Sequence, residues 1–245
     1  MPYSFKSRVR YSETGEDGKL TLSGILNYFQ DCSTFQSQEI GQGLETVKKR
    51  NRIWVISAWQ VVVNRYPKLG EQLVISTFPY QFRGFLGNRN YMMDTPEGER
   101  IAYANSIWTY IDSEKGIPAR LTEKDCEGYI LEEKLDMEYA PRKIALPKVC
   151  TEEESFLVSK QHLDSNHHVN NCQYVRMAAD YLPEGFVVSQ MRVEYKQQAK
   201  LHHMIYPQVA KENEKVTVLL NDQDGNAYAV VEFQAQMPGE RLERE

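Results

Sequence analysis

The chain has 245 residues, with 29 basic and 34 acidic side chains and a formal net charge of −5. Its hydrophobic share of 41% and aromatic share of 11% are enough for a buried core, which excludes a largely disordered chain. The acidic balance excludes a global basic field, so no nucleic-acid partner is expected. The apolar runs are too short to cross a bilayer, and the polar N-terminal stretch has no signal-peptide core, so no membrane insertion is expected.

The first half predicts one strand, one long helix and then four strands. Residues 5–11 are strand-like, and apolar side chains from Leu22 onward repeat at helical spacing, with Thr21 or Ser23 as the cap. Glycines end this helix, and a short polar helix follows at 44–50. Four β-rich runs come next, separated by turn residues, at 53–66, 72–81, 88–94 and 100–112.

The same order recurs after residue 150. A strand-like run at 156–163 and a helix at 169–182 precede four further strand-like runs, at 186–197, 204–211, 216–221 and 228–237. The halves align at one constant offset, which sets Val61 on Met191 and Leu73 on His203. This order predicts a duplicated α+β fold in which each half packs one helix on an antiparallel sheet.

Composition divides the chain into an N-terminal domain at 1–138 and a C-terminal domain at 151–238. The stretch between them, 139–150, contains two prolines and is typical of an extended linker. The charged tail at 239–245 is expected to fray.

Four cysteines are scattered without a CxxC pair: Cys32, Cys126, Cys150 and Cys172. This usage is typical of reduced thiols and predicts a cytoplasmic protein. No HExxH motif or Cys/His ligand spacing is present, so we expect no metal and no cofactor. His202 and His203 are more simply explained as half-exposed strand residues.

Reactive side chains gather just before the second predicted helix. Asp164, Asn166 and His168 stand at i, i+2 and i+4, and in an extended segment they would face one way, with His167 facing the other. An acid, an amide and an imidazole beside a bound carbonyl make a plausible hydrolytic site. The alternative is simple helix capping, which needs only one such residue.

The start of that helix adds a second feature. If the helix begins at Val169, then Asn170 and Asn171 fall in its first turn, where backbone N–H groups lack partners within the helix. Such groups suit a developing oxyanion. Cys172 follows them, but its place on the apolar stripe favours a buried core residue over an acidified thiol.

The string Asp-Ser-Asn-His-His-Val-Asn-Asn at 164–171 resembles the active-site motif of the acyl-acyl carrier protein (acyl-ACP) thioesterases of bacteria and plant plastids. The chain resembles this family also at 53–55, at 60–67, at 106–108 and at 193–196, so the resemblance covers nearly the whole chain. It implies a tandem hot-dog fold and hydrolysis of fatty acyl-ACP to free fatty acid and holo-ACP. It also implies acyl carrier protein as partner.

The resemblance implies catalytic roles for three residues of the string. Asp164 would orient or act as base, Asn166 would hold the thioester carbonyl or the pantetheine end, and His168 would be general base or orienter. Helix-start amides near Asn170 and Asn171 would position the substrate and stabilise the oxyanion. The matching first-half segment at 15–21 has no His or Asn, and that half would house much of the acyl chain.

One position departs from the family pattern. A Glu followed by a Cys is assigned to the site in the plant family, and alignment places Gln198 and Ala199 there. A thiolate mechanism cannot operate without the cysteine, and a Gln cannot take a proton from water. Gln198 could still hold a water or orient His168.

The densest basic run contains Lys48, Lys49, Arg50 and Arg52. A solvated surface is the default for such a run, and docking of the acidic acyl carrier protein is the alternative. Two rival functions also stay open: an acyl-CoA thioesterase of the same fold, and a non-catalytic acyl-binding protein. Neither acyl chain-length preference nor oligomeric state follows from the sequence. Hot-dog sheets often pair edge to edge, which would give a homodimer, and the alternative is that the tandem copy satisfies this pairing within one chain.

Overall fold

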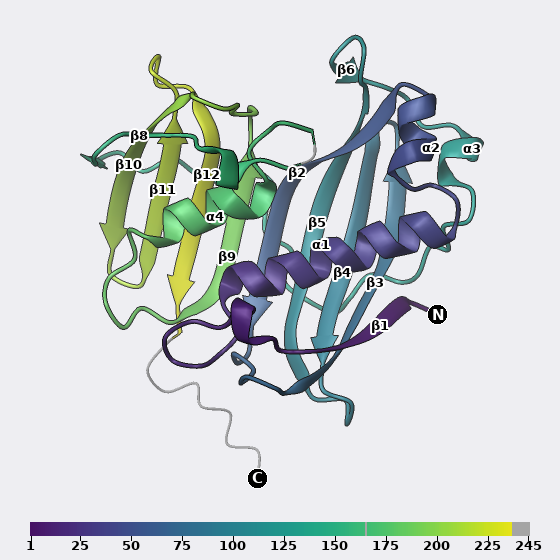
Figure 1. Cartoon of the computed structure of the whole chain (residues 1–245), viewed down its shortest axis with the longest axis horizontal. Helices are drawn as coiled ribbons and strands as arrows, with labels where there is room; N and C mark the ends of the chain where they lie inside the picture. The colour runs from purple at the N-terminus through teal and green to yellow at the C-terminus, as the bar shows by residue number, and fades with distance from the viewer. Residues whose placement is uncertain (165, 237–245) are drawn as a thin grey trace. The chain divides into compact units, whose positions relative to one another are not determined.

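The computed structural model describes residues 1–164 and 166–236 and divides the chain into two compact units (Figure 1). Unit 1 is Met1–Ala140 and unit 2 is Pro141–Glu245, so the division falls inside the stretch predicted as a linker. The predicted tail at 239–245 and the C-terminal limit of the second predicted domain lie outside the described residues. Among the described residues, no helix is both long enough and apolar enough to cross a membrane.

Unit 1 packs one long helix, α1 (Leu22–Glu39), across an antiparallel sheet with the strand order β1-β3-β4-β5-β2 (Figure 1). The strands are β1 (Tyr3–Arg8), β2 (Arg52–Val63), β3 (Gln72–Arg83), β4 (Leu86–Asp94), β5 (Arg100–Asp112) and a short β6 (Ile117–Pro118) that pairs with β5. These confirm the four predicted β-rich runs within a few residues at each end. The shorter helices are η1 (Tyr11–Glu13), α2 (Leu44–Lys49) and α3 (Glu123–Cys126), and α2 was expected from the sequence.

The start and the buried face of α1 follow directly from its sequence. Thr21 is the N-cap, because its Oγ1 accepts a hydrogen bond from the N–H of Gly24 at 3.1 Å. Ile25 and Phe29, one turn apart, are fully buried, and the Phe29 ring lies 5.4 Å from the ring of Tyr91 on β4. The predicted helix-on-sheet core of the first half is therefore confirmed.

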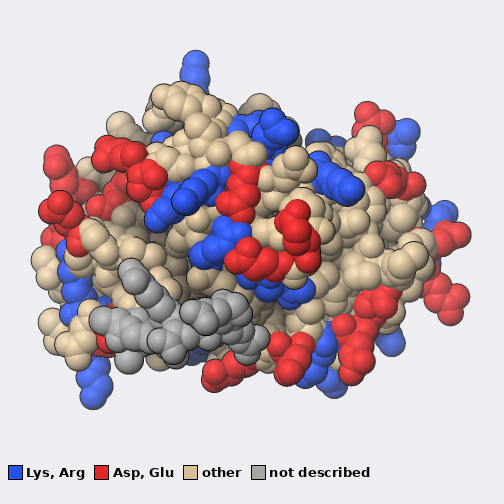
Figure 2. All heavy atoms as spheres, turned by 90° about the horizontal axis from the view of Figure 1, so that it is seen from below, with Lys and Arg blue, Asp and Glu red and all other residues tan. Residues whose placement is uncertain are grey.

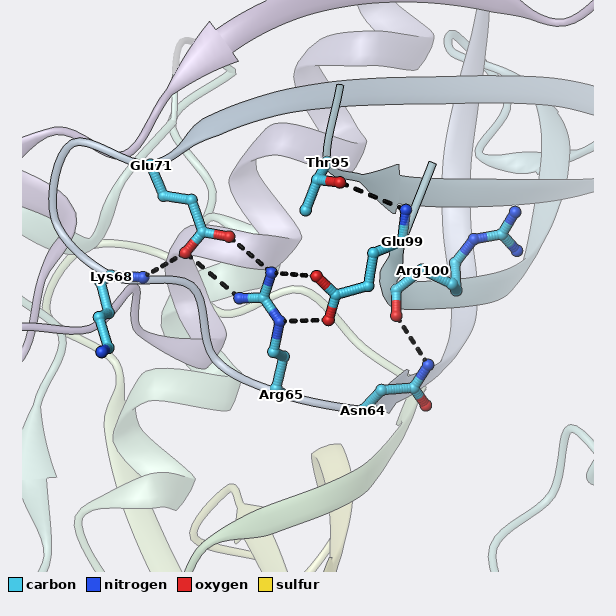
Figure 3. A network of polar contacts seen from close by, with 7 residues as sticks. All are labelled: Asn64, Arg65, Lys68, Glu71, Thr95, Glu99 and Arg100. Carbon is cyan, nitrogen blue, oxygen red and sulfur yellow. Dashed lines mark hydrogen bonds and ion pairs between the residues drawn. The ribbon is translucent and has the colours of Figure 1, made fainter. Parts of the chain in front are cut away.

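A charged network fixes the turn between β2 and β3 (Figure 3). The guanidinium of Arg65 donates two hydrogen bonds to Glu71, at 2.6 and 3.2 Å, and two to Glu99, at 2.6 and 2.7 Å. These bonds lower the pKa of both carboxyl groups. The Glu71 carboxylate also accepts the backbone N–H of Lys68 at 2.9 Å, which ties the turn to the network.

Unit 2 repeats the plan with a shorter helix, α4 (Asn171–Ala179), on a sheet of order β9-β12-β11-β10-β7 (Figure 1). Its strands are β7 (Thr151–Glu152), β8 (Phe156–Leu157), which pairs with β10, β9 (Val188–Tyr195), β10 (Met204–Glu212), β11 (Lys215–Asn221) and β12 (Ala227–Ala235). The strand predicted at 156–163 is wrong beyond Leu157, because the chain turns into the short helix η2 (Lys160–His162).

The stretch that joins the two halves is bonded to each unit separately. In unit 1, the side chain of Gln60 donates to the carbonyl of Glu138 and accepts the N–H of Ala140, both at 2.9 Å. In unit 2, the N–H of Ile144 donates to the Glu194 carboxylate at 3.2 Å, and the Ile144 side chain is fully buried. Side chains on the strands thus bond to the backbone of this stretch within each unit.

Candidate active site

The described residues of the reactive segment in front of α4, 163–164 and 166–170, belong to a tight loop, which we call the site loop. Leu163 and Val169 pair across it as an antiparallel bridge, and the N–H of Asp164 donates to the carbonyl of His168 at 2.8 Å. His167 has φ 62°, in the left-handed region that favours glycine. The extended segment expected from the sequence is therefore wrong, because the chain reverses direction here.

The carboxylate of Asp164 organises the site loop. Its Oδ1 accepts the backbone N–H of Asn166 at 2.8 Å and that of His168 at 3.3 Å. In the part of the chain that is described, Oδ2 has no hydrogen-bond partner. One carboxylate oxygen thus accepts two backbone N–H groups of the site loop.

The N-cap of α4 is Asn170, so the prediction that the helix begins at Val169 is wrong. The Asn170 Oδ1 accepts the N–H of Cys172 at 2.9 Å, and its carbonyl accepts the N–H of Gln173 at the same distance. Both of these helix-start amides are occupied. Among described residues none accepts a hydrogen bond from the N–H of Asn171.

The segment that follows β9, residues 196–200, lies against the site loop. The N–H of Val169 donates to the carbonyl of Ala199 at 3.0 Å, and His168 forms a β-bridge with Lys200. On the other side, the buried hydroxyl of Tyr174 on α4 accepts the N–H of Ala199 at 2.8 Å. The structure therefore brings the 196–200 segment, including the exposed Gln198, alongside the loop.

The imidazole of His168 is half-buried, and its pKa lies below the ordinary histidine value of 6.5. Desolvation is the main cause, the negative charge of Asp164 opposes it, and the positive charges of Lys200 and His167 add to it. His168 is therefore neutral at pH 7 and able to accept a proton. Lys200 was not expected from the sequence, since no spacing rule links it to a residue so far away along the chain.

Unit 1 builds the same loop without a histidine or an asparagine. The N–H of Gly15 donates to the carbonyl of Lys19 at 2.9 Å, and that of Leu20 to the carbonyl of Pro67 at 2.8 Å. Gly18 has φ 70°, where the site loop has His167. The hydrogen bonds equate the loops position by position: Gly15 with Asp164, Asp17 with Asn166, Lys19 with His168, and Thr21 with Asn170.

This equivalence corrects the offset read from the sequence. The carbonyl of Pro67 accepts the loop N–H in unit 1, as the carbonyl of Ala199 does in unit 2. The C-terminal ends of β2 and β9 are therefore equivalent, so that Val63 aligns with Tyr195 and not with Val193. The inward and outward faces are the same in both alignments, since the shift is one full side-chain period of a strand. The duplication itself is confirmed.

Two members of the basic run are engaged inside unit 1. Arg50 lies 3.8 Å from the carboxylate of Asp125, and Arg52 lies 2.8 Å from that of Asp112. The two lysines of the run end α2 and are exposed. On the face shown in Figure 2, Lys and Arg side chains are interspersed with Asp and Glu and form no continuous basic area in the described part of that face.

Cys172 is a core residue, as the apolar stripe predicted. Its side chain is 5% exposed, and burial raises the pKa of its thiol to about 12. A thiol with this pKa remains protonated at neutral pH and is a poor nucleophile.

Two family models match most of the chain. The acyl-ACP thioesterase N-terminal domain matches residues 2–129, and the acyl-ACP thioesterase C-terminal domain matches residues 147–236. A chloroplastic palmitoyl-acyl carrier protein thioesterase of Arabidopsis thaliana is 25% identical over 78% of this chain and 50% of its own length. The chloroplastic oleoyl-acyl carrier protein thioesterase 1 of the same plant is 24% identical over 76% and 56%. The chain thus spans about half the length of the curated relatives it matches.

Solved structures agree with this fold over nearly the whole chain. An acyl-ACP thioesterase from Bacteroides thetaiotaomicron has a TM-score of 0.85 at 18% identity and covers 95% of this chain and 97% of its own. The 12:0-ACP thioesterase of Umbellularia californica has a TM-score of 0.83 at 18% identity, covering 96% and 97%. These likenesses confirm the tandem hot-dog fold. With matches to both family domains, the chain belongs to the acyl-ACP thioesterase family.

Proposed function

We propose that this chain hydrolyses the thioester of fatty acyl-ACP to release a free fatty acid and holo-ACP. The observation that carries the proposal is the pair of matching loops. Unit 1 builds the loop with Lys19 where unit 2 has His168, and Asp17 there supplies the carboxylate that accepts the N–H of Lys19. The frame therefore does not require the imidazole, and a side chain that the fold can do without is best explained by chemistry, which favours catalysis over simple capping.

In the proposed reaction, water attacks the thioester carbonyl. The neutral imidazole of His168 takes a proton from this water or orients it, and the Oδ2 of Asp164 orients the imidazole or acts as the base. The N–H of Asn171 and the side chain of Asn166 would hold the carbonyl oxygen as it becomes an oxyanion. Collapse of the tetrahedral intermediate breaks the C–S bond, and the thiolate takes up a proton to become the thiol of holo-ACP.

Gln198 has a positioning role in this proposal. It cannot deprotonate water, but its amide can orient one, and the pairing of the 196–200 segment with the site loop supports this role. Acyl carrier protein as the carrier of the substrate follows from family membership. Lys48 and Lys49 are the better candidates for docking it, because Arg50 and Arg52 already have carboxylate partners in unit 1.

We further propose a cytoplasmic location. The four cysteines are scattered along the sequence without a CxxC pair, which is typical of proteins in a reducing compartment. A homodimer stays a prediction, and light scattering on the purified chain would measure its mass in solution.

The test is the release of free thiol from acyl-ACP and acyl-CoA that carry the same acyl chain. We expect turnover of acyl-ACP with a higher kcat/KM than acyl-CoA. A preference for acyl-CoA would favour the rival thioesterase. No thiol release from either substrate, by a chain that still binds the acyl group, would identify a non-catalytic acyl-binding protein.

A further inference from the structure

The interior of unit 1 contains a polar cluster beneath the C-terminal half of α1. Arg89 on β4 donates through Nη1 to the side-chain oxygen of Gln36 on α1 and, at 3.2 Å, to the hydroxyl of Thr77 on β3. The ring of Tyr129 lies 5.5 Å from the centre of the guanidinium. Arg89 is 7% and Gln36 8% exposed, so a narrow part of the cluster is open to solvent.

The positive charge of Arg89 has no negative partner. Within residues 1–164 and 166–236, no Asp or Glu forms an ion pair with it. Its two hydrogen bonds both leave from Nη1, whereas a guanidinium has five N–H donors. A buried charge is costly unless it is paired, so the cluster has donor capacity that the described protein atoms do not use.

A second unused donor lies on the same face of β4. The hydroxyl of Tyr91 is fully buried, and no described residue gives it a hydrogen bond of good geometry. Burial raises the pKa of Tyr91, and the positive charge of Arg89 and the nearby hydroxyls of Ser33 and Ser106 oppose this rise. The bonds of good geometry that these two serines make run to other groups. The Ser33 hydroxyl donates to the carbonyl of Gln30 at 2.9 Å, and the Ser106 hydroxyl accepts the indole N–H of Trp108 at 2.7 Å.

Two unused donors, one of them charged, suit a group rich in acceptor oxygens. We propose that Arg89 and Tyr91 bind an oxygen function on the acyl chain of the substrate, either a hydroxyl or a terminal carboxylate. The inference rests on the proposed thioesterase function, since that function makes an acyl chain the ligand. A site built to hydrogen-bond a substrate oxygen discriminates against the analogue that lacks it, because its own donors are then buried unpaired.

The experiment compares three acyl-ACP substrates with equal carbon number: unsubstituted, hydroxylated near the distal end, and with a terminal carboxylate. For the natural chain we expect kcat/KM for at least one oxygenated substrate to exceed that for the plain one by about tenfold or more. Arg89→Met should bring this ratio close to one, and Tyr91→Phe should lower it severalfold. Plain chains favoured over both oxygenated ones would overturn the proposal, and would fit a cluster filled only by water.

Tyr28→Phe is the matched control. The hydroxyl of Tyr28, also in unit 1, donates to the carbonyl of Arg8 at 2.9 Å and lies 2.7 Å from the Glu13 carboxylate. Its loss should lower stability and leave the substrate ratio as it is. Tyr91→Phe should fold normally, since it removes a hydroxyl that has no partner, so the test stands even if Arg89→Met is unstable.

A binding measurement separates this inference from the proposed function. Dodecanedioate should raise the Tm of the natural chain more than dodecanoate does, and Tyr91→Phe and Arg89→Met should reduce that difference. This result would support the site even if no thioester were cleaved. Equal shifts from the two probes would count against the site while leaving thioester hydrolysis intact.

Discussion

At the scale of single residues, the site loop separates two adjacent histidines by backbone conformation. His168 is half-buried and bonded through its backbone to Asp164, whereas His167 is exposed at a left-handed φ. His168→Ala should lower kcat by about 10²–10⁴, the usual effect of losing a positioned acid–base group. The folded fraction should not change, since unit 1 builds the loop without a histidine.

His167→Gly is the control for that variant. It places glycine where unit 1 has Gly18, so stability should be equal or higher by about 0.5–1 kcal/mol, with activity largely retained. Steady-state kinetics and urea unfolding measure the two effects. Equal losses of kcat at both histidines would contradict the assignment of His168.

The pKa of His168 makes a further prediction about pH. Burial lowers this pKa, so the neutral, active imidazole should persist below pH 6.5, and kcat/KM should fall only as the pH drops through the lowered value. Lys200→Met removes a positive charge that contributes to the lowering, and should move the acidic limb to higher pH. Lys211→Met, an exposed lysine on β10, is the control. If Lys200→Met does not shift the acidic limb of the kcat/KM profile, the group that titrates in this limb is not His168.

Gln198 separates two accounts of water activation. If His168 or Asp164 moves the proton, Gln198→Ala should cost about 0.5–1.5 kcal/mol in the activation barrier, and Gln198→Glu should help little. If a carboxylate is needed at this position, Gln198→Glu should raise kcat tenfold or more. We expect the first outcome, because an acid and an imidazole already share the site loop. The kcat values of the three forms on one acyl-ACP, at neutral pH, decide between the two.

At the scale of elements, both helices begin with a polar side chain that accepts a backbone N–H. Thr21 does so for α1 and Asn170 for α4. Thr21→Ala and Asn170→Ala should therefore each destabilise the chain by about 0.5–2 kcal/mol in urea unfolding. Only Asn170→Ala should also lower kcat, since α4 alone follows a loop with reactive side chains. If Thr21→Ala and Asn170→Ala both lower kcat, the loss of activity comes from reduced stability and not from a role of Asn170 at the site.

At the scale of the whole molecule, the net charge of −5 does not attract an acidic carrier protein. Any attraction must therefore come from a local group of basic side chains. Lys48→Glu with Lys49→Glu should raise KM for acyl-ACP and barely change it for a short free thioester. The effect should fade in high salt, because exposed charges more than about 10 Å apart are screened at 0.1 M. Lys211→Glu is the control on another surface. If the double change does not alter the KM for acyl-ACP, the two lysines have no role in docking the carrier protein.

The sequence by itself determined the duplicated α+β plan, most strand positions, the two candidates for the cap of α1 and the string that marks the family. Those features are local: apolar period, capping residues and turn residues act over a few positions. Only the tertiary structure decided what depends on distant backbone. The carbonyl of Ala199 holds the N–H of Val169 and so delays the start of α4, and Lys200 reaches His168 through the same pairing. The hydrogen bond between Arg89 and Gln36 likewise became visible only when β4 packed against α1.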